Sequence, residues 1–373
     1  MPPAVIDVRR AEDPRDVVHR AVQAVSEGRL VAFPTETVYG LAARAVDAAA
    51  VSRLMEVKGR KKGHPLTLAI KSAEEAQDYV PDMPPLARRL ARRCWPGPIT
   101  LVLDDSHPES LIRHLPGSVQ QAVSPENAVG LRVPGHALIL DVLRMLVGPL
   151  VLTSANRHGQ PDPRNAREVL DALGEDVDLV LDDGPSRFGL PSSVVRVRDN
   201  QYELLRAGVV PEKALRRLVR WMVLFVCTGN TCRSPMAEAI CRKLLAERLG
   251  CTIAELEDRG FVVASAGLAA AIPGEASAEA IRVAAEHGVD LSGHQTQPLT
   301  ESLVRHADLI YTMTQSHRQA ITAQWPNAAD RTWLLSASGG DITDPVGGPL
   351  ERYQRCAAQI EEALRARIAY WEF

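Results

Sequence analysis

The sequence has little of several things that mark special classes of protein. Aromatic residues make up only 4% of its 373 residues, and five of its six cysteines follow residue 226 without a regular spacing. Such sparse cysteines favour reduced thiols in a cytoplasm over structural disulfides. No apolar run approaches the roughly 18 residues of a membrane span, and the N-terminal segment carries acids and prolines where a secretory signal needs a basic end. We therefore expect a cytoplasmic enzyme without a membrane segment.

An excess of charge of one sign is missing too. The chain has 43 Lys and Arg against 46 Asp and Glu, a net charge of −3, so no global basic field indicates nucleic-acid binding. The halves differ in sign. Residues 1–220 hold 30 basic and 28 acidic side chains (+2), whereas residues 221–373 hold 13 and 18 (−5). Any RNA or nucleotide contact is therefore expected in the first half.

The length exceeds the roughly 100 to 200 residues of a single domain, which predicts two domains. In the first half, short β-rich runs alternate with helical stretches and indicate a mixed α/β sheet. In the second half, the pattern predicts strands at 222–227, 261–265 and 308–313 and helices at 235–249, 276–287, 315–324 and 349–370. Such alternation is typical of βαβ units and a parallel sheet. We expect domains at 1–210 and 222–373, joined by a helical, semi-rigid junction at 211–221.

The most specific motif is the segment VLFVCTGNTCRSPMAEAI, which predicts a strand, a tight loop and a helix N-terminus in succession. Cys227 and Arg233 bracket five residues. The amide groups of the loop and the positive end of the helix converge on one point, as in other phosphate sites, and favour a thiolate there. Arg233 offers a planar fork for two phosphate oxygens. Ser234 can cap the helix and donate to the thiolate, while Gly229 and Asn230 suit positive φ angles.

A thiolate that attacks phosphorus forms a phosphocysteine and expels a leaving group that needs a proton. Asp344, in the segment DITDPVGG, is the candidate general acid, and Pro345 gives its loop a fixed shape. The predicted phosphate loop comprises Thr228, Gly229, Asn230, Thr231, Cys232 and Ser234.

From Met222 to about Ile368, the second half resembles the low-molecular-weight protein tyrosine phosphatases. The matches are the Cys227 loop, SAG at 265–267, DLIYTMTQSH at 308–317 and Asp344-Pro345. The resemblance implies a Rossmann-like, four-stranded parallel sheet and phosphorylated protein substrates, without a cofactor. It also implies three roles: Cys227 is the nucleophile, Arg233 the phosphate clamp and Asp344 the general acid.

Within that family, CTGNTCRSPMAEA and DPVGG look closer to the bacterial protein arginine phosphatases. Thr231 matches a Thr of the arginine phosphatases where the tyrosine enzymes commonly have Ile, and Val346 stands where the latter commonly carry an aromatic residue. We therefore expect a preference for phosphoarginine over phosphotyrosine. The alternative is a redox-regulated tyrosine phosphatase or redox sensor, with Cys227 and Cys232 as its switching pair.

The first half has neither a Walker loop nor GxGxxG, so generic motifs do not reveal nucleotide use. FPTETVYGLA at 33–42 predicts a strand that runs into a polar turn. KGRKKGHP at 58–65 places four basic residues within five positions, which we expect to lie exposed on a loop after a helix, where they can gather phosphate oxygens. SAN at 154–156 ends a β run, a position where ligand contacts of α/β sheets gather.

Together these segments resemble the threonylcarbamoyl-adenylate synthase (YrdC-like) family, along with WPGPITLVL at 95–103, LRVP at 131–134, SSVVRV at 192–197 and LLRAG at 204–208. The resemblance implies a twisted, mixed or mostly parallel sheet around a positively charged cavity. It implies that L-threonine, bicarbonate and ATP, with Mg²⁺, give threonylcarbamoyl-AMP and pyrophosphate, the first step toward N6-threonylcarbamoyladenosine at position 37 of tRNA. Further partners would be tRNA and the proteins of tRNA threonylcarbamoylation.

The same resemblance assigns residues to two ligands. The ATP-binding residues would be Lys58, Arg60, His64, Asn156 and Arg206. The threonine-binding residues would be Thr37, Arg132, Ser154 and Ser192, with Arg132 facing the carboxylate. No protein side chain is expected to hold a metal.

The chain departs from this family's pattern at four positions. Lys61 and His64 stand where Pro and Asn are usual, Ala69 where a His is frequent, and Arg196 where an acid is usual. The alternative is therefore a module that binds RNA or nucleotide without adenylating threonine. Pyrophosphate that forms only when ATP, threonine and bicarbonate are all present would separate the two.

Overall fold

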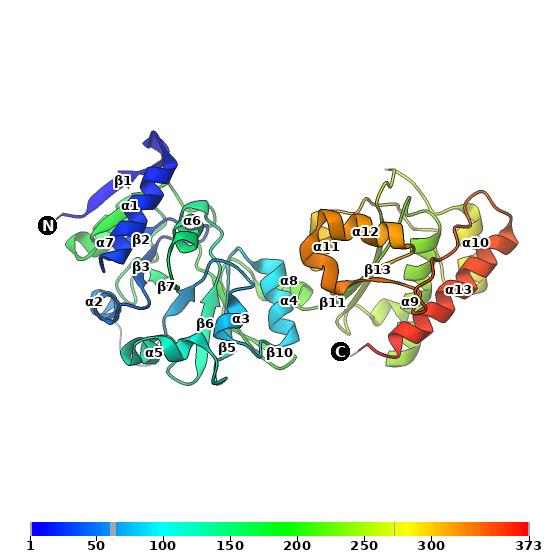
Figure 1. Ribbon diagram of the computed structural model, residues 1–373, viewed down its shortest axis with the longest axis horizontal. Coiled ribbons are helices and arrows are strands. Elements are labelled where there is room, and N and C mark those ends of the chain that lie inside the picture. Colours follow the sequence, from blue (N-terminus) through cyan, green and yellow to red (C-terminus); the bar gives the residue numbers. More distant parts are fainter. Residues whose placement is uncertain (1, 60–64, 272, 372–373) are drawn as a thin grey trace. The chain divides into compact units, whose positions relative to one another are not determined.

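The computed structural model describes residues 2–59, 65–271 and 273–371 (Figure 1). The chain divides into two compact units, Met1–Leu218 and Val219–Phe373. Helix α8 (Glu212–Leu218) ends the first unit, and strand β11 (Trp221–Cys227) begins the second. In the described ranges, no helix is long and apolar enough to cross a membrane.

The first unit is built on a ten-stranded sheet in the order β1-β8-β2-β3-β7-β4-β6-β5-β9-β10. Its strands are β1 (Ala4–Asp7), β2 (Val31–Phe33), β3 (Gly40–Arg44), β4 (Thr67–Ala69), β5 (Ile99–Asp104), β6 (Ala128–Arg132), β7 (Leu150–Ser154), β8 (Leu179–Asp182), β9 (Ser193–Arg198) and β10 (Gln201–Arg206). Among the described residues, four neighbouring pairs are parallel and five antiparallel.

The expected mixed sheet is confirmed, but the expectation of a mostly parallel sheet is wrong. For two of the five antiparallel pairs, the reason lies in the connections. Strands β9 and β10 are joined by two residues, and β2 and β3 by six, at 34–39. Parallel pairing needs a crossover of a dozen or more residues, so these short connections impose antiparallel pairs.

Eight helices accompany this sheet in the described part of the unit: α1 (Pro14–Ser26), α2 (Ala48–Lys58), α3 (Ala76–Tyr79), α4 (Pro85–Cys94), α5 (Gly117–Val123), α6 (Ala137–Met145), α7 (Ala166–Leu173) and α8. Two of them show how the sequence sets their ends. Helix α1 begins at Pro14 after the cap residue Asp13, whose carboxylate accepts the Arg15 amide at 2.9 Å. Helix α2 ends at Gly59 with a φ of 58°, a conformation that glycine adopts without strain. The position of this helix end decides where Lys58 lies.

The second unit has a four-stranded, all-parallel sheet in the order β12-β11-β13-β14, as expected. Its elements are β11, β12 (Phe261–Gly267), β13 (Leu309–Thr312), β14 (Thr332–Leu334), α9 (Arg233–Leu249), α10 (Ala278–Glu286), α11 (Glu301–His306), α12 (Gln315–Gln324) and α13 (Leu350–Ile368). Strand β14 is a strand that the sequence pattern did not predict.

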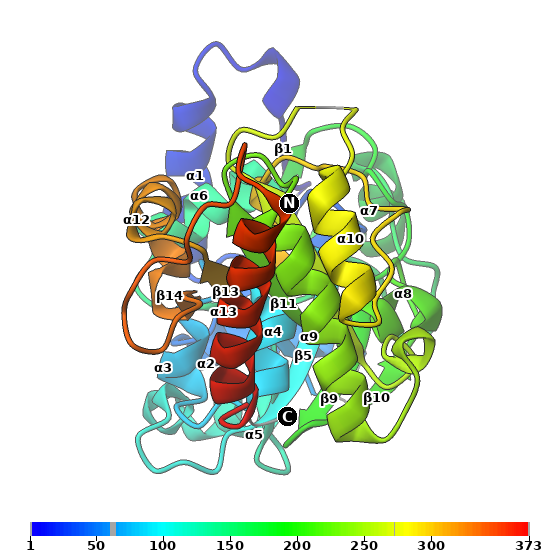
Figure 2. The same cartoon turned by 90° about the vertical axis from the view of Figure 1, so that its right-hand side faces the viewer.

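Strand β11 divides the core of this unit into two. Its alternate residues Trp221, Val223, Phe225 and Cys227 join one buried cluster with residues of α9, α10 and α13. Met222, Leu224 and Val226 join the other, with residues of α11 and α12. This period-two alternation is what a strand covered on both faces requires. Figure 2 shows α9, α10 and α13 side by side on their face of the sheet.

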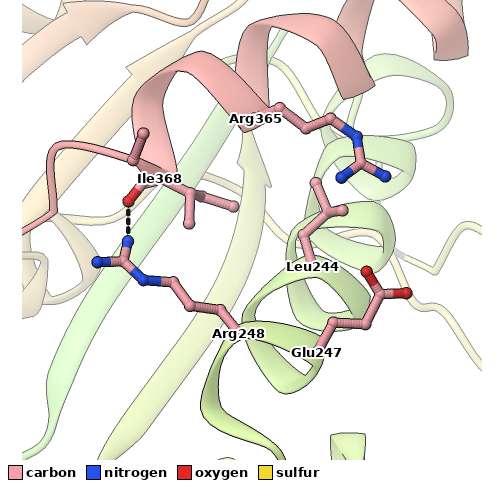
Figure 3. A pocket seen from close by; sticks show the side chains of 6 residues that line it. Leu244, Glu247, Arg248, Arg365 and Ile368 are labelled. Carbon is pink, nitrogen blue, oxygen red and sulfur yellow. Dashed lines mark hydrogen bonds between the residues drawn. The ribbon is translucent and has the colours of Figure 1, made fainter.

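The end of the chain closes the first of these clusters. The Trp371 ring lies 4.9 Å from that of Trp221, and its indole donates to the Tyr311 hydroxyl at 3.1 Å. At the C-terminal ends of α9 and α13, a cavity of about 380 Å³ is lined by Leu244, Glu247, Arg248, Arg365, Ile368 and Ala369. There Arg248 donates to the Ile368 carbonyl (Figure 3). Helix α9 has 17 residues, about 25 Å, so this cavity is far from the Cys227 loop at its N-terminus.

Candidate active sites

Donors outside the loop between β11 and α9 form hydrogen bonds with the backbone carbonyls of the loop and hold it in place. Each of four carbonyls accepts a hydrogen bond: Cys227 from the Leu268 amide, Thr228 from the Ala269 amide, Asn230 from His294 Nε2 and Thr231 from the Ser277 amide. In a planar trans peptide, the carbonyl and the following amide point in opposite directions. The next amides therefore point into the loop, beside the N-terminus of α9, and form a cradle for an oxyanion.

Asn230 organises the interior of this loop. Its φ is 58°, and its side-chain amide donates to the hydroxyls of Ser234 and Ser265, both at 2.9 Å. The Asn230 backbone amide and the Ser234 hydroxyl lie 3.3 and 3.0 Å from Cys227 Sγ. Two expectations are corrected. Gly229 has no positive φ, and Ser234 lies inside the first turn of α9, where Cys232 takes the cap position without a side-chain bond.

Arg233 and Asp344 meet at the mouth of the loop. Arg233 Nη2 lies 2.5 Å from Asp344 Oδ2, and the arginine side chain is only 6% exposed while that of the aspartate is 43% exposed. The structure thus brings Cys227, Arg233 and Asp344 together. A phosphate that takes the guanidinium fork competes with Asp344 for the same N–H groups, which would free the carboxyl group for a leaving group.

His317 also belongs to this site, and the sequence reasoning did not single it out. Its Nε2 lies 2.9 Å from the Thr228 hydroxyl, and its Nδ1 lies 2.9 Å from the Thr314 hydroxyl, which caps α12. Burial and the positive charge of Arg233 lower the pKa of His317. The neutral ring can accept from Thr228, directly after the cysteine. The segment DLIYTMTQSH contains this histidine, but nothing in the sequence links it to Thr228.

The cysteines of the loop are both buried and reduced. Cys227 and Cys232 are 3% and 5% exposed, and all six cysteines are free thiols. Cys232 Sγ lies 3.4 Å from the Ser277 hydroxyl and 3.6 Å from the Tyr353 hydroxyl. The second thiol is therefore held by polar contacts within the core that surrounds the loop.

In the first unit, three groups of predicted residues meet. The first is centred on Lys58, the last residue of α2. Its Nζ donates to the Ser154 carbonyl at 2.7 Å and to Asn156 Oδ1 at 2.6 Å, and the residue is only 3% exposed. The expectation of an exposed Lys58 is wrong, because α2 does not end before Lys58 and the side chain is directed against the end of β7. Arg60, Lys61 and His64 lie outside the described residues.

The second group is centred on Arg132, at the end of β6. Its Nη2 donates to Glu36 Oε1 at 2.7 Å and to the Thr37 hydroxyl at 2.9 Å. Both charged side chains of this ion pair are 8% exposed. A buried ion pair needs further hydrogen bonds to offset its desolvation, and Glu36 Oε2 accepts one from the Gly135 amide at 2.8 Å. Glu36 was not among the predicted residues, although it lies within the motif PTETVYGL.

The third group is centred on Ser192. The guanidinium of Arg206 donates to the Ser192 carbonyl at 3.0 Å, and the Ser192 hydroxyl lies 3.0 Å from that of Thr100. This group and the first share a cavity of about 90 Å³, lined by Val38, Thr67, Leu152, Thr153, Ser154, Asp162, Pro191, Ser192 and Arg206. The second group lies nearby, since Val38 of the cavity directly follows Thr37 and the charge of Arg132 acts on Arg206. Asp162, 3.3 Å from Asn156 Nδ2, is a further residue that the sequence reasoning missed.

The structure shows the surroundings of two residues, Ala69 and Arg196, that depart from the synthase pattern. Ala69, in β4, is buried and pairs in register with Arg132. A methyl group therefore stands beside the arginine. Arg196, in β9, lies 3.7 Å from Glu203 of the neighbouring strand, so its charge is paired across the hairpin.

Comparisons with known proteins agree with this division. The Sua5, YciO and YrdC family, described as "Telomere recombination", matches residues 23–208, and the family "Low molecular weight phosphotyrosine protein phosphatase" matches residues 222–370. A putative threonylcarbamoyl-AMP synthase of Mycobacterium leprae is 37% identical over 190 residues, 51% of this chain and 82% of that protein. A protein-arginine-phosphatase of Bacillus subtilis is 40% identical over 147 residues, 38% of this chain and 91% of that protein.

The chain belongs to both families. We call residues 1–218 the Sua5-like unit and residues 219–373 the phosphatase-like unit. The threonylcarbamoyl-AMP synthase of Pyrococcus abyssi is 36% identical over 195 residues. The chain spans only 55% of the length of that protein and 59% of a Bacillus subtilis synthase. A crystal structure of P. abyssi Sua5 complexed with L-threonine matches with a TM-score of 0.52 at 26% identity, over 70% of this chain and 92% of that one.

Proposed function

We propose that the chain is a bifunctional cytoplasmic enzyme. The Sua5-like unit would act as an L-threonylcarbamoyladenylate synthase, and the phosphatase-like unit as a cysteine-dependent protein phosphatase. The observation that supports the first activity is the convergence of three polar groups around one cavity, in a unit whose relatives are named threonylcarbamoyl-AMP synthases. The observation that supports the second is the amide cradle with Cys227, Arg233 and Asp344 at its mouth.

In the synthase reaction, cations would hold the ATP phosphates and a polar pocket would hold threonine. Arg206 lines the shared cavity, and Lys58 donates to the carbonyl of Ser154, which also lines it; both cations can neutralise phosphate oxygens, with Asn156 placing the nucleotide. We assign Arg60 and His64 to the same ligand. Mg²⁺ would arrive bound to the ATP phosphates and offset their charge.

Threonine would lie beside the Arg132 group. Arg132 donates to Thr37 from the same Nη2 that pairs with Glu36. The carboxylate of the substrate can take the free donors of this guanidinium, while Thr37, Ser154 and Ser192 offer hydroxyls for its polar atoms. The product, threonylcarbamoyl-AMP, would serve tRNA threonylcarbamoylation.

A substrate-omission assay tests the synthase. Pyrophosphate should form only when ATP, L-threonine and bicarbonate are present together. Release of pyrophosphate without threonine, or none with all three substrates, would favour a module that only binds RNA or nucleotide.

In the phosphatase reaction, Cys227 Sγ would attack phosphorus in line with the leaving group, while the loop amides and Arg233 hold the three equatorial oxygens. Asp344 would protonate the leaving group, and its carboxylate would then activate water to hydrolyse the phosphocysteine. Turnover of p-nitrophenyl phosphate tests this mechanism. Cys227→Ser should lower it by roughly a thousandfold or more. Equal turnover by wild type and variant would remove the mechanism.

We further propose that phosphoarginine is preferred over phosphotyrosine. Val346 is 62% exposed next to the Asp344-Pro345 turn, so this side of the site lacks an aromatic wall for a phenyl ring. Thr231 can narrow the pocket, and Asp344 can pair with a substrate guanidinium. The ratio of kcat/KM for the two phospho-amino acids should favour phosphoarginine and should fall in Thr231→Ile. An unchanged ratio in that variant, or a wild-type preference for phosphotyrosine, would contradict the assignment.

A further inference from the structure

A histidine–aspartate pair adjoins the Arg132 group and has no role so far. His136 Nε2 lies 3.1 Å from Asp183 Oδ2, and the two side chains are 20% and 32% exposed. The other ring nitrogen, Nδ1, is buried, and no group among the described residues forms a hydrogen bond with it. Most buried polar atoms have a partner, so this unpaired nitrogen needs an explanation, and a ligand atom that reaches it would supply one.

The tautomer of the ring follows from its partner. A carboxylate accepts hydrogen bonds, so Nε2 is the nitrogen that donates to Asp183, and in the form of the ring that can act as a base the lone pair is on Nδ1. The backbone at Asp183 is itself held in place, since the Asp183 main-chain amide donates to the Tyr39 hydroxyl at 3.2 Å, and that hydroxyl donates to the Gly184 carbonyl at 2.7 Å. Burial raises the pKa of Tyr39, which keeps its hydroxyl protonated. The ring is therefore oriented as a base with Nδ1 as its basic atom.

The backbone holds this ring next to the proposed threonine site. Gly135, the preceding residue, donates its amide to Glu36 Oε2, the carboxylate that pairs with Arg132. A Cβ on Gly135 would lie 3.1 Å from Glu36 Cδ and 3.4 Å from Gly97 Cα, so the backbone here is tightly enclosed. His136 thus stands one residue from the Glu36–Arg132 ion pair. Among the described charged groups, Asp183 contacts the ring itself, Glu36 and Arg132 are connected to it through the Gly135 amide, and Asp182 through Tyr39.

We propose that His136 is the general base that removes a proton from the ammonium group of threonine, and that Asp183 is its positioning residue. This proposal rests on the synthase activity proposed above. Of the three ammonium protons, one passes to His136 Nδ1. The nitrogen lone pair then forms the bond to the carbon of bicarbonate, the C–OH bond breaks, a second proton leaves with the hydroxide as water, and the third stays on the carbamate nitrogen. Asp183 stabilises the imidazolium that forms.

The setting of Ala69 agrees with this role. Ala69 stands where the synthase family often has a histidine, and its methyl group lies in register with Arg132. In this chain, β4 therefore brings no imidazole to the site. His136, four residues after Arg132, brings one from another strand end.

The test is the pyrophosphate assay on the full chain, with His136→Gln as the variant. The glutamine Nε2 can still donate to Asp183, but the side chain has no basic nitrogen. We expect kcat to fall by about 10² to 10⁴-fold, with little change in the KM for threonine and an unchanged melting temperature. His19→Gln, on the exposed face of α1, is the matched control and should behave as wild type.

The other outcomes are distinct. A wild-type kcat in His136→Gln, or a raised KM for threonine with an unchanged kcat, would overturn the proposal. If that variant does not fold, Asp183→Asn decides. It should lower kcat at least about tenfold and shift the ascending limb of the kcat–pH profile, and an unaltered kcat and profile would overturn the proposal. A wild-type chain that makes no pyrophosphate would instead remove the synthase activity itself.

Discussion

The two sites differ in how the chain assembles them. The phosphatase-like unit forms its phosphate cradle from eight consecutive residues, 227–234, and the loop is fixed by bonds from outside to its backbone carbonyls. The Sua5-like unit gathers its site from distant segments, and the gathered side chains bond to one another. In the first case the loop is held largely through its backbone, so a change at the nucleophile alone leaves those bonds in place. In the second, the proposed substrate-binding side chains themselves link strands and helices, so function and stability are coupled.

The sharpest test of this contrast is Lys58→Ala against Cys227→Ser. Lys58→Ala should abolish pyrophosphate formation and also lower the stability of the Sua5-like unit. It removes the charged donor of the Ser154 and Asn156 carbonyls, at about 1–3 kcal/mol for each group left unsatisfied, while Asn156 Oδ1 still accepts from the Ser154 hydroxyl. Cys227→Ser should abolish phosphatase activity with little change in stability. Melting curves measure the stability of each variant, and the pyrophosphate and p-nitrophenyl phosphate assays measure its two activities.

Lys213→Ala, an exposed lysine on α8, is the control for the loss of a positive charge, and it should leave both activities and the melting curve unchanged. A Lys58→Ala chain that is inactive but melts like wild type would break the contrast, because Lys58 would then contribute only charge.

Oxidation tests the contiguous site. Peroxide should inactivate the phosphatase activity fully and reversibly, through a sulfenic acid on Cys227 that Cys232 resolves to a disulfide. Pyrophosphate formation should persist, since the predicted residues of the Sua5-like site include no cysteine. Mass spectrometry before and after dithiothreitol measures the linkage. Sulfonic acid on Cys227 with a free Cys232 would contradict this prediction.

Gly267, which lies against the Cys227 loop, tests whether the backbone of that loop positions the groups that bind phosphate. A Cβ on Gly267 would lie 2.6 Å from the Thr228 carbonyl oxygen and 3.0 Å from the Asn230 amide. Gly267→Ala should therefore displace the cradle and lower kcat/KM for p-nitrophenyl phosphate by roughly 10². Gly293→Ala, whose Cβ would meet nothing within 4 Å, is the matched control. Equal activity of the two variants would show that the loop adjusts freely.

The smallest effect concerns acid. The folded state lowers the pKa of His317 below its usual value near 6.5, through burial and the charge of Arg233. Below that value the unfolded chain binds a proton that the folded chain resists, so stability is lost as pH falls from 6.5 toward the lowered pKa. The melting temperature of the phosphatase-like unit should fall from pH 7.5 to pH 5.5 by more in wild type than in His317→Gln. An equal fall in melting temperature in wild type and in His317→Gln would contradict the assignment of this titration to His317.

The sequence predicts the contiguous site much better than the dispersed one. Cys227 and Arg233 lie on one loop of adjacent residues, and a single turn brings Asp344 to them, so few long-range contacts are needed to assemble this site. By contrast, the burial of Lys58 depends on the register between the end of α2 and β7, which no local pattern reveals. Glu36 and Asp162 become visible only when their partners Arg132 and Asn156, far along the chain, are in place.

The fold shows the same division. Strands with strong apolar runs, such as β11, lie where the pattern predicts them. Strand β14 has only three residues and one of them, Trp333, is 45% exposed, so its pattern is too short and too weakly buried to detect. Two of the antiparallel pairs of the large sheet, β2–β3 and β9–β10, follow from loop lengths that become clear only once the strand ends are known.

The Trp221–Trp371 contact of the second unit is part of an uneven distribution of tryptophans between the two units. Of its five tryptophans, only Trp95 lies before residue 219, and the others are Trp221, Trp325, Trp333 and Trp371. Trp221 begins the strand that ends at Cys227 and packs on Trp371. Intrinsic fluorescence therefore reports chiefly on the melting of the phosphatase-like unit, while circular dichroism reports on both. The two signals can follow the units separately in one intact chain.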